Sequence, residues 1–290
     1  SFCRENLSHC PSSARNWCAA CGGSFPASLH VQQGRDQACW DLAGPLESPM
    51  PCGREYGIFL RGLTFNDDFG GLCTTKRFDS LESLDGLTFG ILHYTQNDLS
   101  GLLQQFRRED ANAYQTIFGS VGTPLTSPAI CQLQRDLRGA GCHPGLMRAL
   151  RQALVHPSFT RVQIQNSYQK MQTRLRLAAR FGFQSSYGQL AYAIATNNPG
   201  SCGCRDCLPF TNVRNACQTA FAGNDEQAKI TCFLDKYVEL GCRGGVASAG
   251  RRRAVIIRML GNLSRSAPPA PPSVNQVINC VSSLRSQPQR

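Results

Sequence analysis

The sequence has no segment typical of a membrane span, a phosphate-binding loop or a histidine-ligated metal site. Its longest apolar stretches, such as residues 191 to 196, are far shorter than the ~20 residues that a membrane helix requires. Neither Gly70-Gly71 nor Gly244-Gly245 is followed by the Lys-Ser/Thr pair of a phosphate loop. The histidines are widely dispersed, at His9, His30, His93, His143 and His156. We therefore expect no membrane insertion, no cofactor and no bound metal.

Cysteine, by contrast, is abundant, with 16 residues in the chain. An even and unusually high number favours disulfide bonds and an oxidising compartment. Zinc is the alternative, because Cys18-x-x-Cys21 and Cys202-x-Cys204-x-x-Cys207 have spacings that zinc sites use. Most other cysteines stand singly along the chain, which suits cross-links better. Spacing does not determine which cysteines pair.

The charge balance points to an anionic partner. Lys and Arg number 30 against 19 Asp and Glu, giving a formal net charge of +11. Nucleic acid, anionic lipid and bacterial wall polymers would all be attracted. The basic residues are scattered, however, without the interleaved aromatics on which bases stack. We therefore expect a wall polymer and no nucleic acid.

The chain divides by composition into three parts. Residues 1 to 31 are rich in Cys, Ser and Gly and predict a disulfide-tied arm, residues 32 to 265 predict the main domain, and residues 266 to 290 form a tail that begins with a Pro-rich linker. Within the main domain, residues 57 to 65 and 87 to 94 have a strand pattern, with a turn at residues 66 to 68. Helical patterns cover residues 36 to 47, 99 to 106, 131 to 137, 145 to 155, 158 to 181, 189 to 196, 216 to 222, 226 to 240 and 251 to 260. The sequence predicts an α+β fold that is predominantly α-helical, with one small sheet.

The most informative segment is residues 85 to 95, in which an Asp-Gly turn runs directly into a short strand-like stretch. Asp85 opens the segment, and Thr88, His93 and Tyr94 follow along it. A cleft that binds and cuts a polar polymer would use such an acid beside a strand. The same pattern is also the commonest short hairpin signal, which leaves a purely structural interpretation open.

Further segments occur downstream of Asp85 in a definite order. The first piece is Asp85-Gly-x-Thr-x-Gly-Ile, and Gln163, Gln165 and Tyr168 lie on a predicted helix. Residues 181 to 186 read as a link in which Gly182 ends one helix and Ser185 or Ser186 caps the next. Residues 197 to 200 and 251 to 261 complete the series. In this order the pieces resemble lysozyme-like glycoside hydrolases related to the family 46 chitosanases, including muramidase domains of type VI secretion spikes and effectors.

The resemblance implies a lysozyme-like fold with a small antiparallel sheet beside an active-site cleft, and it assigns the acids. Glycosidases use one carboxylic acid as proton donor and a second carboxylate across the sugar. By motif Asp85 is the second carboxylate, with Glu82 as a substitute because the loop after Asp85 is short. Glu47, which follows a predicted helix, is the expected donor, and Glu55 is the alternative.

The resemblance also implies substrate-binding residues. Thr88 would lie near the catalytic water or the sugar, and Tyr94, Gln96 and Asn97 would line the sugar subsites. Relatives often carry an Asp on the central helix, whereas residues 191 to 195 contain none. This departure argues against a chitosan-like substrate that needs additional acidic subsites.

Together these features predict a muramidase that hydrolyses peptidoglycan. Because the chain begins at Ser1 without a signal peptide, we interpret it as the toxic domain of a longer, secreted antibacterial effector. Such a protein would act as a monomer in the periplasm of target bacteria and would have an immunity protein as partner. A non-catalytic glycan-binding module is the first alternative. The second is a zinc-stabilised nucleic-acid-binding protein, which would show a steep salt dependence of binding.

Overall fold

The computed structural model describes most of the helical part of the chain. It covers residues 31–33, 54–69, 72–75, 81–82, 88–92, 94, 96–121, 144–197, 199–203, 208–261 and 273–285. The predicted helices at 36 to 47 and 131 to 137 lie outside these residues, as do Glu47 and Asp85. The predicted arm at residues 1 to 31 is described only at its last residue, and the domain boundaries stay predictions.

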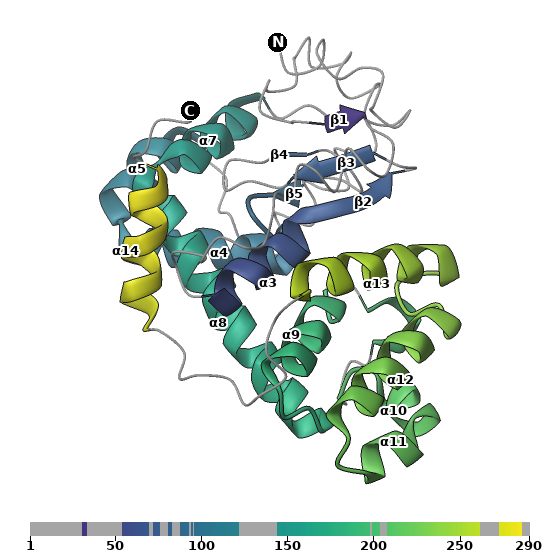
Figure 1. Cartoon of the computed structure of the whole chain (residues 1–290). Helices are drawn as coiled ribbons and strands as arrows, with labels where there is room; N and C mark the ends of the chain where they lie inside the picture. The colour runs from purple at the N-terminus through teal and green to yellow at the C-terminus, as the bar shows by residue number, and fades with distance from the viewer. Residues whose placement is uncertain are drawn as a thin grey trace. The chain divides into compact units, whose positions relative to one another are not determined.

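The chain forms two compact units. One contains Ser1–Gln32 and Thr74–Ser167, and the other contains Gln33–Cys73 and Tyr168–Arg290. The long helix α8, Pro157–Phe181, is labelled in Figure 1. Its residues 157 to 167 belong to the first unit and its residues 168 to 181 to the second. The described residues of each unit lie mainly in helices, which confirms the prediction of a predominantly helical fold.

The described strands are short. β1 (Val31–Gln33), β3 (Leu72–Thr75) and β2 (Phe65–Phe69) form a sheet in the order β1-β3-β2. β4 (Leu81–Glu82) and β5 (Thr88–Phe89) pair antiparallel, with Leu81 opposite Phe89 and Glu82 opposite Thr88. That a sheet forms one wall of a cleft stays a prediction.

In the first unit, the apolar spacing of α4, Gln96–Glu109, produces its core face. Leu99, Leu102, Leu103 and Phe106 recur every three or four residues, and each is fully buried, as the sequence predicts. The other helical elements of this unit are α5 (Ala111–Phe118), η1 (Gly119–Val121), α7 (Pro144–Val155) and the first half of α8. This packing gives α8 a buried face on which the candidate site is built.

The second unit surrounds α9, Ser186–Ala195, which is almost entirely buried, as predicted for a central helix. α3, α12 and α13 pack against it. Apart from α9, the described helical elements of this unit are the second half of α8, α3 (Arg54–Thr64), η2 (Gly200–Cys202), α10 (Thr211–Ala216), α11 (Gln218–Ala222), α12 (Glu226–Glu239), α13 (Val246–Leu260) and α14 (Val274–Arg285). The predicted helix at 226 to 240 is confirmed, and α13 begins five residues earlier than predicted.

The predicted strand at residues 57 to 65 is wrong. Residues 54 to 64 form α3, and the predicted turn at residues 66 to 68 lies inside β2. Tyr56, Phe59 and Leu63 recur at the helical period and are buried, whereas the glycines and aromatic residues suggested a strand. Gly62 has a packing role, because a Cβ at this position would lie 2.5 Å from Cδ1 of Ile194 on α9. The helical period therefore dominates over local β propensity here.

No described helix combines the length and apolar character needed to cross a membrane.

Asp110 joins the start of α5 to the start of α8 in the first unit, and this contact predicts an acid-sensitive stability. Its Oδ1 accepts a hydrogen bond from the Ala113 amide at 3.0 Å, and its Oδ2 accepts one from Oγ of Ser158 at 2.6 Å. The Ser158 bond, followed by the Ala113 bond, lowers the pKa of Asp110 below 3.8. A lowered folded-state pKa means that the carboxylate stabilises the fold above pH 3.8 and that this contribution is lost as the pH falls further.

We expect Ser158→Ala to lower the thermal midpoint at pH 6 and to lose this difference from wild type below pH 3.8. Melting curves between pH 2 and 6 measure it. Thr231→Ala, which loses the 2.9 Å bond from Gln227 without involving an acid, is the control. A Ser158→Ala deficit that stays constant with pH would contradict the account.

Candidate functional site

The Thr88 to Tyr94 segment forms a closed loop on the first unit. Phe89 and Tyr94 exchange two backbone hydrogen bonds, from the Phe89 amide to the Tyr94 carbonyl at 3.1 Å and from the Tyr94 amide to the Phe89 carbonyl at 2.8 Å. Thr88 and Phe89 are also the residues of β5, which pairs with β4. The segment that carries the Thr-x-Gly-Ile motif is therefore held by backbone pairing at both ends.

Gln163 on α8 binds the tip of this loop. The Ile91 amide donates a 2.9 Å hydrogen bond to Oε1 of Gln163, and this contact is buried. Gly90 has φ of +72°, a conformation that favours glycine, and a Cβ built on it would collide with the same oxygen. The motif requires glycine here for both reasons.

An aromatic cluster fixes the loop beside Gln163. The ring of Phe89 meets that of Phe159 edge to face at 5.3 Å between centroids, and Phe159 meets Phe106 on α4 at 5.2 Å. Phe159 and Gln163 are four residues apart and share one face of α8. Consecutive residues of the loop therefore contact consecutive turns of the helix.

The structure brings two of the predicted site residues together. Glu82 and Thr88 are directly opposite each other in the β4–β5 pair. Asp85 belongs to the connection between these strands, which lies outside the described residues, as does Glu47. The assignment of proton donor and second carboxylate therefore stays a prediction.

The predicted sugar-binding residues follow the loop. Tyr94 closes it and has a side chain that is only 2% exposed. Gln96 and Asn97 are the first residues of α4. Their roles in sugar binding stay predictions.

Glu55, the alternative donor, lies in the first turn of α3 in the second unit. It contributes to the raised pKa of Tyr168, for which burial is the main cause. The ring of Tyr168 also meets that of Tyr56 edge to face at 5.5 Å between centroids. Glu55 therefore lies close to an aromatic residue of the predicted Gln…Tyr helix.

The predicted link between two helices is confirmed at residues 181 to 186. Gly182 follows α8 with φ of +122°, and the side chain of Ser185 caps α9 by accepting a bond from the Gly188 amide at 3.0 Å. Sequence reasoning missed Glu226, whose Oε1 accepts bonds from the amides of Gln184 and Ser185 at 3.0 and 2.9 Å and from the Ser185 hydroxyl at 2.8 Å. Because Glu226 follows Asp225, the N-cap of α12, it reads in sequence as a first-turn acid with no further role.

Glu226→Ala should destabilise the second unit by about 2 kcal/mol. The variant removes three hydrogen bonds to the Glu226 carboxylate at the start of α9. The Gln184 amide can bond to water instead because its contact is exposed, whereas the buried Ser185 loses its partner, and a bond to a charged group contributes about 1.5–3 kcal/mol. Glu226→Gln retains an acceptor and should cost less than half as much. Urea denaturation of the two variants and wild type measures both differences. Equal losses in the two variants would show that the acceptor is not what matters.

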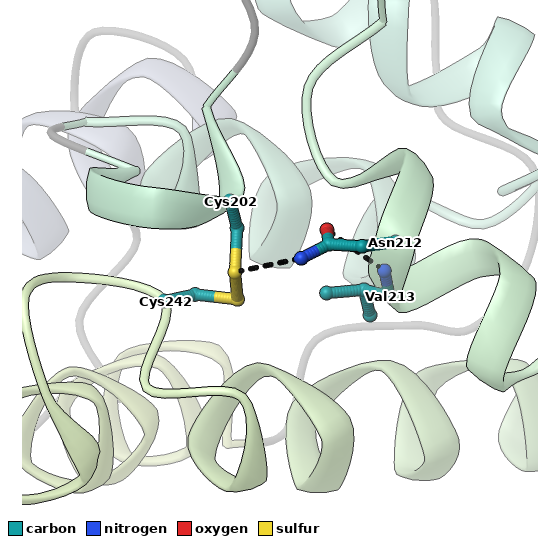
Figure 2. The surroundings of a disulfide bond; sticks show 4 residues. All are labelled: Cys202, Asn212, Val213 and Cys242. Carbon is teal, nitrogen blue, oxygen red and sulfur yellow. Dashed lines mark hydrogen bonds between the residues drawn. A yellow bond between two sulfur atoms is a disulfide. The ribbon is translucent and has the colours of Figure 1, made fainter.

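Two disulfides support the interpretation of the cysteines as cross-links. Cys202 is bonded to Cys242, and Cys217 to Cys232. Figure 2 shows the first of these, with the side-chain amide of Asn212 donating to Sγ of Cys202 at 3.4 Å. Cys202 is therefore not available as a thiolate for the zinc alternative. No group of three potential metal-ligating side chains occurs among the residues that the structure describes.

Comparison with known proteins identifies the fold. No family model matches the chain, and no curated protein matches its sequence. A solved chitosanase complex is similar in structure, with a TM-score of 0.50 and 18% sequence identity, over 77% of this chain and 93% of that chain. At this identity the similarity concerns the fold alone. The chain thus has a predominantly helical fold like that of a chitosanase, as the ordered motifs implied. The small sheet beside an active-site cleft stays a prediction.

Proposed function

We propose that the chain is a glycoside hydrolase of the lysozyme type that cleaves the glycan strands of peptidoglycan. The observation that carries the proposal is the motif loop, in which Gly90 and Ile91 are seated on Gln163. Its sequence resembles the segment that the related glycosidases use beside their second carboxylate, with a shorter loop between Asp85 and Thr88. The chitosanase-like fold is the second line of support.

The chemistry needs two acids on opposite sides of the scissile bond. One protonates the leaving oxygen, and the other activates water or stabilises positive charge on the sugar. Asp85 is proposed as the second carboxylate, with Glu82 as its substitute beside Thr88. Glu47 is proposed as the proton donor, and Glu55 is the alternative. Thr88 would hold the water or the sugar by its hydroxyl.

The charge of the chain favours peptidoglycan over chitosan as substrate. Chitosan is a polymer of glucosamine and carries protonated amines, so a chain of net charge +11 repels it. Peptidoglycan and its attached acidic polymers are anionic and would be attracted. The buried helix α9 also carries no carboxylate that could pair with a cationic sugar.

The cysteines favour a setting outside the reducing cytosol. Disulfides persist in secreted and periplasmic proteins, and two are present in the second unit. We propose that the chain acts in the periplasm of target bacteria as the toxic domain of a secreted effector. A producing cell would then need an immunity protein that binds the domain.

Digestion of purified peptidoglycan tests the proposal, with chitosan as the second substrate. Wild type should release reducing-end muropeptides, identified by mass spectrometry, and should leave chitosan intact. Asp85→Asn and one of Glu47→Gln, Glu55→Gln and Glu82→Gln should release at least about 100-fold less, as expected when an acid or base is lost. Glu239→Gln, which loses only a surface ion pair with Lys236, is the matched control.

The outcomes separate the alternatives. A wild type that sediments with peptidoglycan but releases nothing would replace the enzyme proposal with the non-catalytic binding module. Release from chitosan alone would retain the glycosidase and overturn the substrate. Normal activity in all four carboxylate variants would overturn the assignment of the acids.

A further inference from the structure

Gln163 is a polar residue in a position that packing alone would fill with an apolar one. It is fully buried on α8, between Val162 and Ile164, which are also fully buried. A buried amide lowers stability unless its groups are hydrogen-bonded. Its presence therefore indicates a polar group nearby with which an apolar side chain could not form a hydrogen bond. The Ile91 amide, 72 residues away in sequence, is such a partner.

The contact restrains the loop in two ways. The hydrogen bond from Ile91 draws the loop toward α8, while the close approach of Gly90 to the same amide group stops it from moving nearer. Phe89, the residue before Gly90, packs edge to face on Phe159, which lies one turn before Gln163 on α8. The loop therefore has one position on α8.

Backbone pairing carries this restraint to the strand that contains Glu82, one of the candidate acids. Phe89, next to the clamped residues, pairs with Leu81, and Thr88 pairs with Glu82. A slip of one residue in such a pair would turn every side chain to the opposite face. Fixing Phe89 thus fixes the register of the backbone pairs that Leu81 and Glu82 make with Phe89 and Thr88.

We propose that Gln163 is the positioning residue of the candidate active site. Its amide oxygen holds Phe89, Gly90 and Ile91 in one position on α8, and hydrolysis depends on that position because Glu82 and Thr88, two of the proposed site residues, are paired in register with it. The inference rests on the proposed glycosidase function for its catalytic consequence. The clamp itself is independent of what the chain hydrolyses.

Steady-state kinetics on soluble peptidoglycan fragments test the catalytic consequence. Gln163→Met keeps the length of the side chain but removes the acceptor, and we expect kcat to fall about 100-fold, with KM changed by less than about threefold, because a misplacement of about 1 Å has such an effect. Gln165→Met is the matched control, since Gln165 lies on the same helix and also accepts a side-chain hydrogen bond, from Gln105 on α4 at 3.0 Å. It should leave both constants within about twofold of wild type.

The conservative variant Gln163→Glu separates positioning from simple loss of packing. A carboxyl group still accepts a hydrogen bond, so activity should return to at least about a third of wild type at pH 5. As the pH rises, the activity of Gln163→Glu should fall faster than that of wild type, because burial disfavours the charged form of the introduced acid. A packing role alone would give Met and Glu variants with the same pH profile.

Hydrogen exchange of the segment around Ile91 tests the clamp without any substrate. In Gln163→Met, peptides covering residues 86 to 95 should exchange at least about tenfold faster than in wild type and Gln165→Met, with the other helices unchanged. If Gln163→Met exchanges faster but wild type cuts no glycan, the contact between Gln163 and the loop is supported and the proposed function is overturned. Unchanged exchange, or wild-type kcat in a folded Gln163→Met, would overturn the inference.

Discussion

Replacing Cys202 and Cys242 together by serine will lower the free energy of unfolding by about 4 kcal/mol under oxidising conditions. The bond closes a sequence separation of 40 residues, and the chain-entropy relation gives about this value for a loop of that length. Both cysteines are buried, at 3% and 0% exposure, so each serine would also place a hydroxyl in an apolar position. Urea denaturation followed by circular dichroism measures the change.

The second disulfide provides an internal comparison. Cys217 and Cys232 are separated by 15 residues, for which the same relation gives about 3 kcal/mol. Serine replacement of this pair should therefore cost less than replacement of Cys202 and Cys242. Wild type treated with a reductant should be less stable than either variant under oxidising conditions. If reduction leaves the wild-type curve unchanged, the disulfides do not stabilise the fold.

A reducing environment would consequently weaken the second unit. Cys202 lies in η2 and Cys242 lies between α12 and α13, whereas Cys217 lies between α10 and α11 and Cys232 lies in α12. The two bonds therefore cross-link the part of the chain from η2 to the start of α13. A domain with this dependence reaches full stability only under oxidising conditions. The stability measurement thus bears on the proposed periplasmic setting as well as on the fold.

The helices could be predicted where an apolar period runs uninterrupted. α4 and the link after α8 were predicted correctly because a helix face and a glycine-serine boundary are local patterns. α3 was mistaken for a strand, because two glycines broke its period and its large residues also suit strands. Gly62 is there for the close approach of α9, which no local pattern reveals.

The candidate site was predictable in its pieces and not in its contacts. The motif loop and Gln163 were both identified, yet nothing local relates Ile91 to a side chain 72 residues away. Glu226 and Ser185 are similarly 41 residues apart. Disulfide pairs follow the same rule, since proximity in space depends on the packing of helices. Contacts of this kind need coordinates, or a resemblance strong enough to supply them.

Phe233→Ala should be the most destabilising single core substitution in the second unit, at about 3–5 kcal/mol, the range for buried Phe→Ala changes. Phe233 on α12 is fully buried at the centre of an aromatic cluster. Its ring centroid lies within 6.2 Å of those of Phe181, Phe183, Tyr192, Phe210 and Tyr237. Removing it leaves a cavity that several rigid rings cannot fill together.

Phe221→Ala is the matched control for this prediction. Phe221 contacts two rings of the same cluster, Phe181 and Phe183, but it is only partly buried, so less apolar area is lost. Thermal and urea unfolding should give a loss at least about 1.5 kcal/mol smaller for Phe221→Ala than for Phe233→Ala. Similar losses would mean that the cluster relaxes around either cavity and that Phe233 is not its central residue. A larger loss at Phe233 would instead show that α8, α9 and α12 depend on one shared aromatic core centred on its ring.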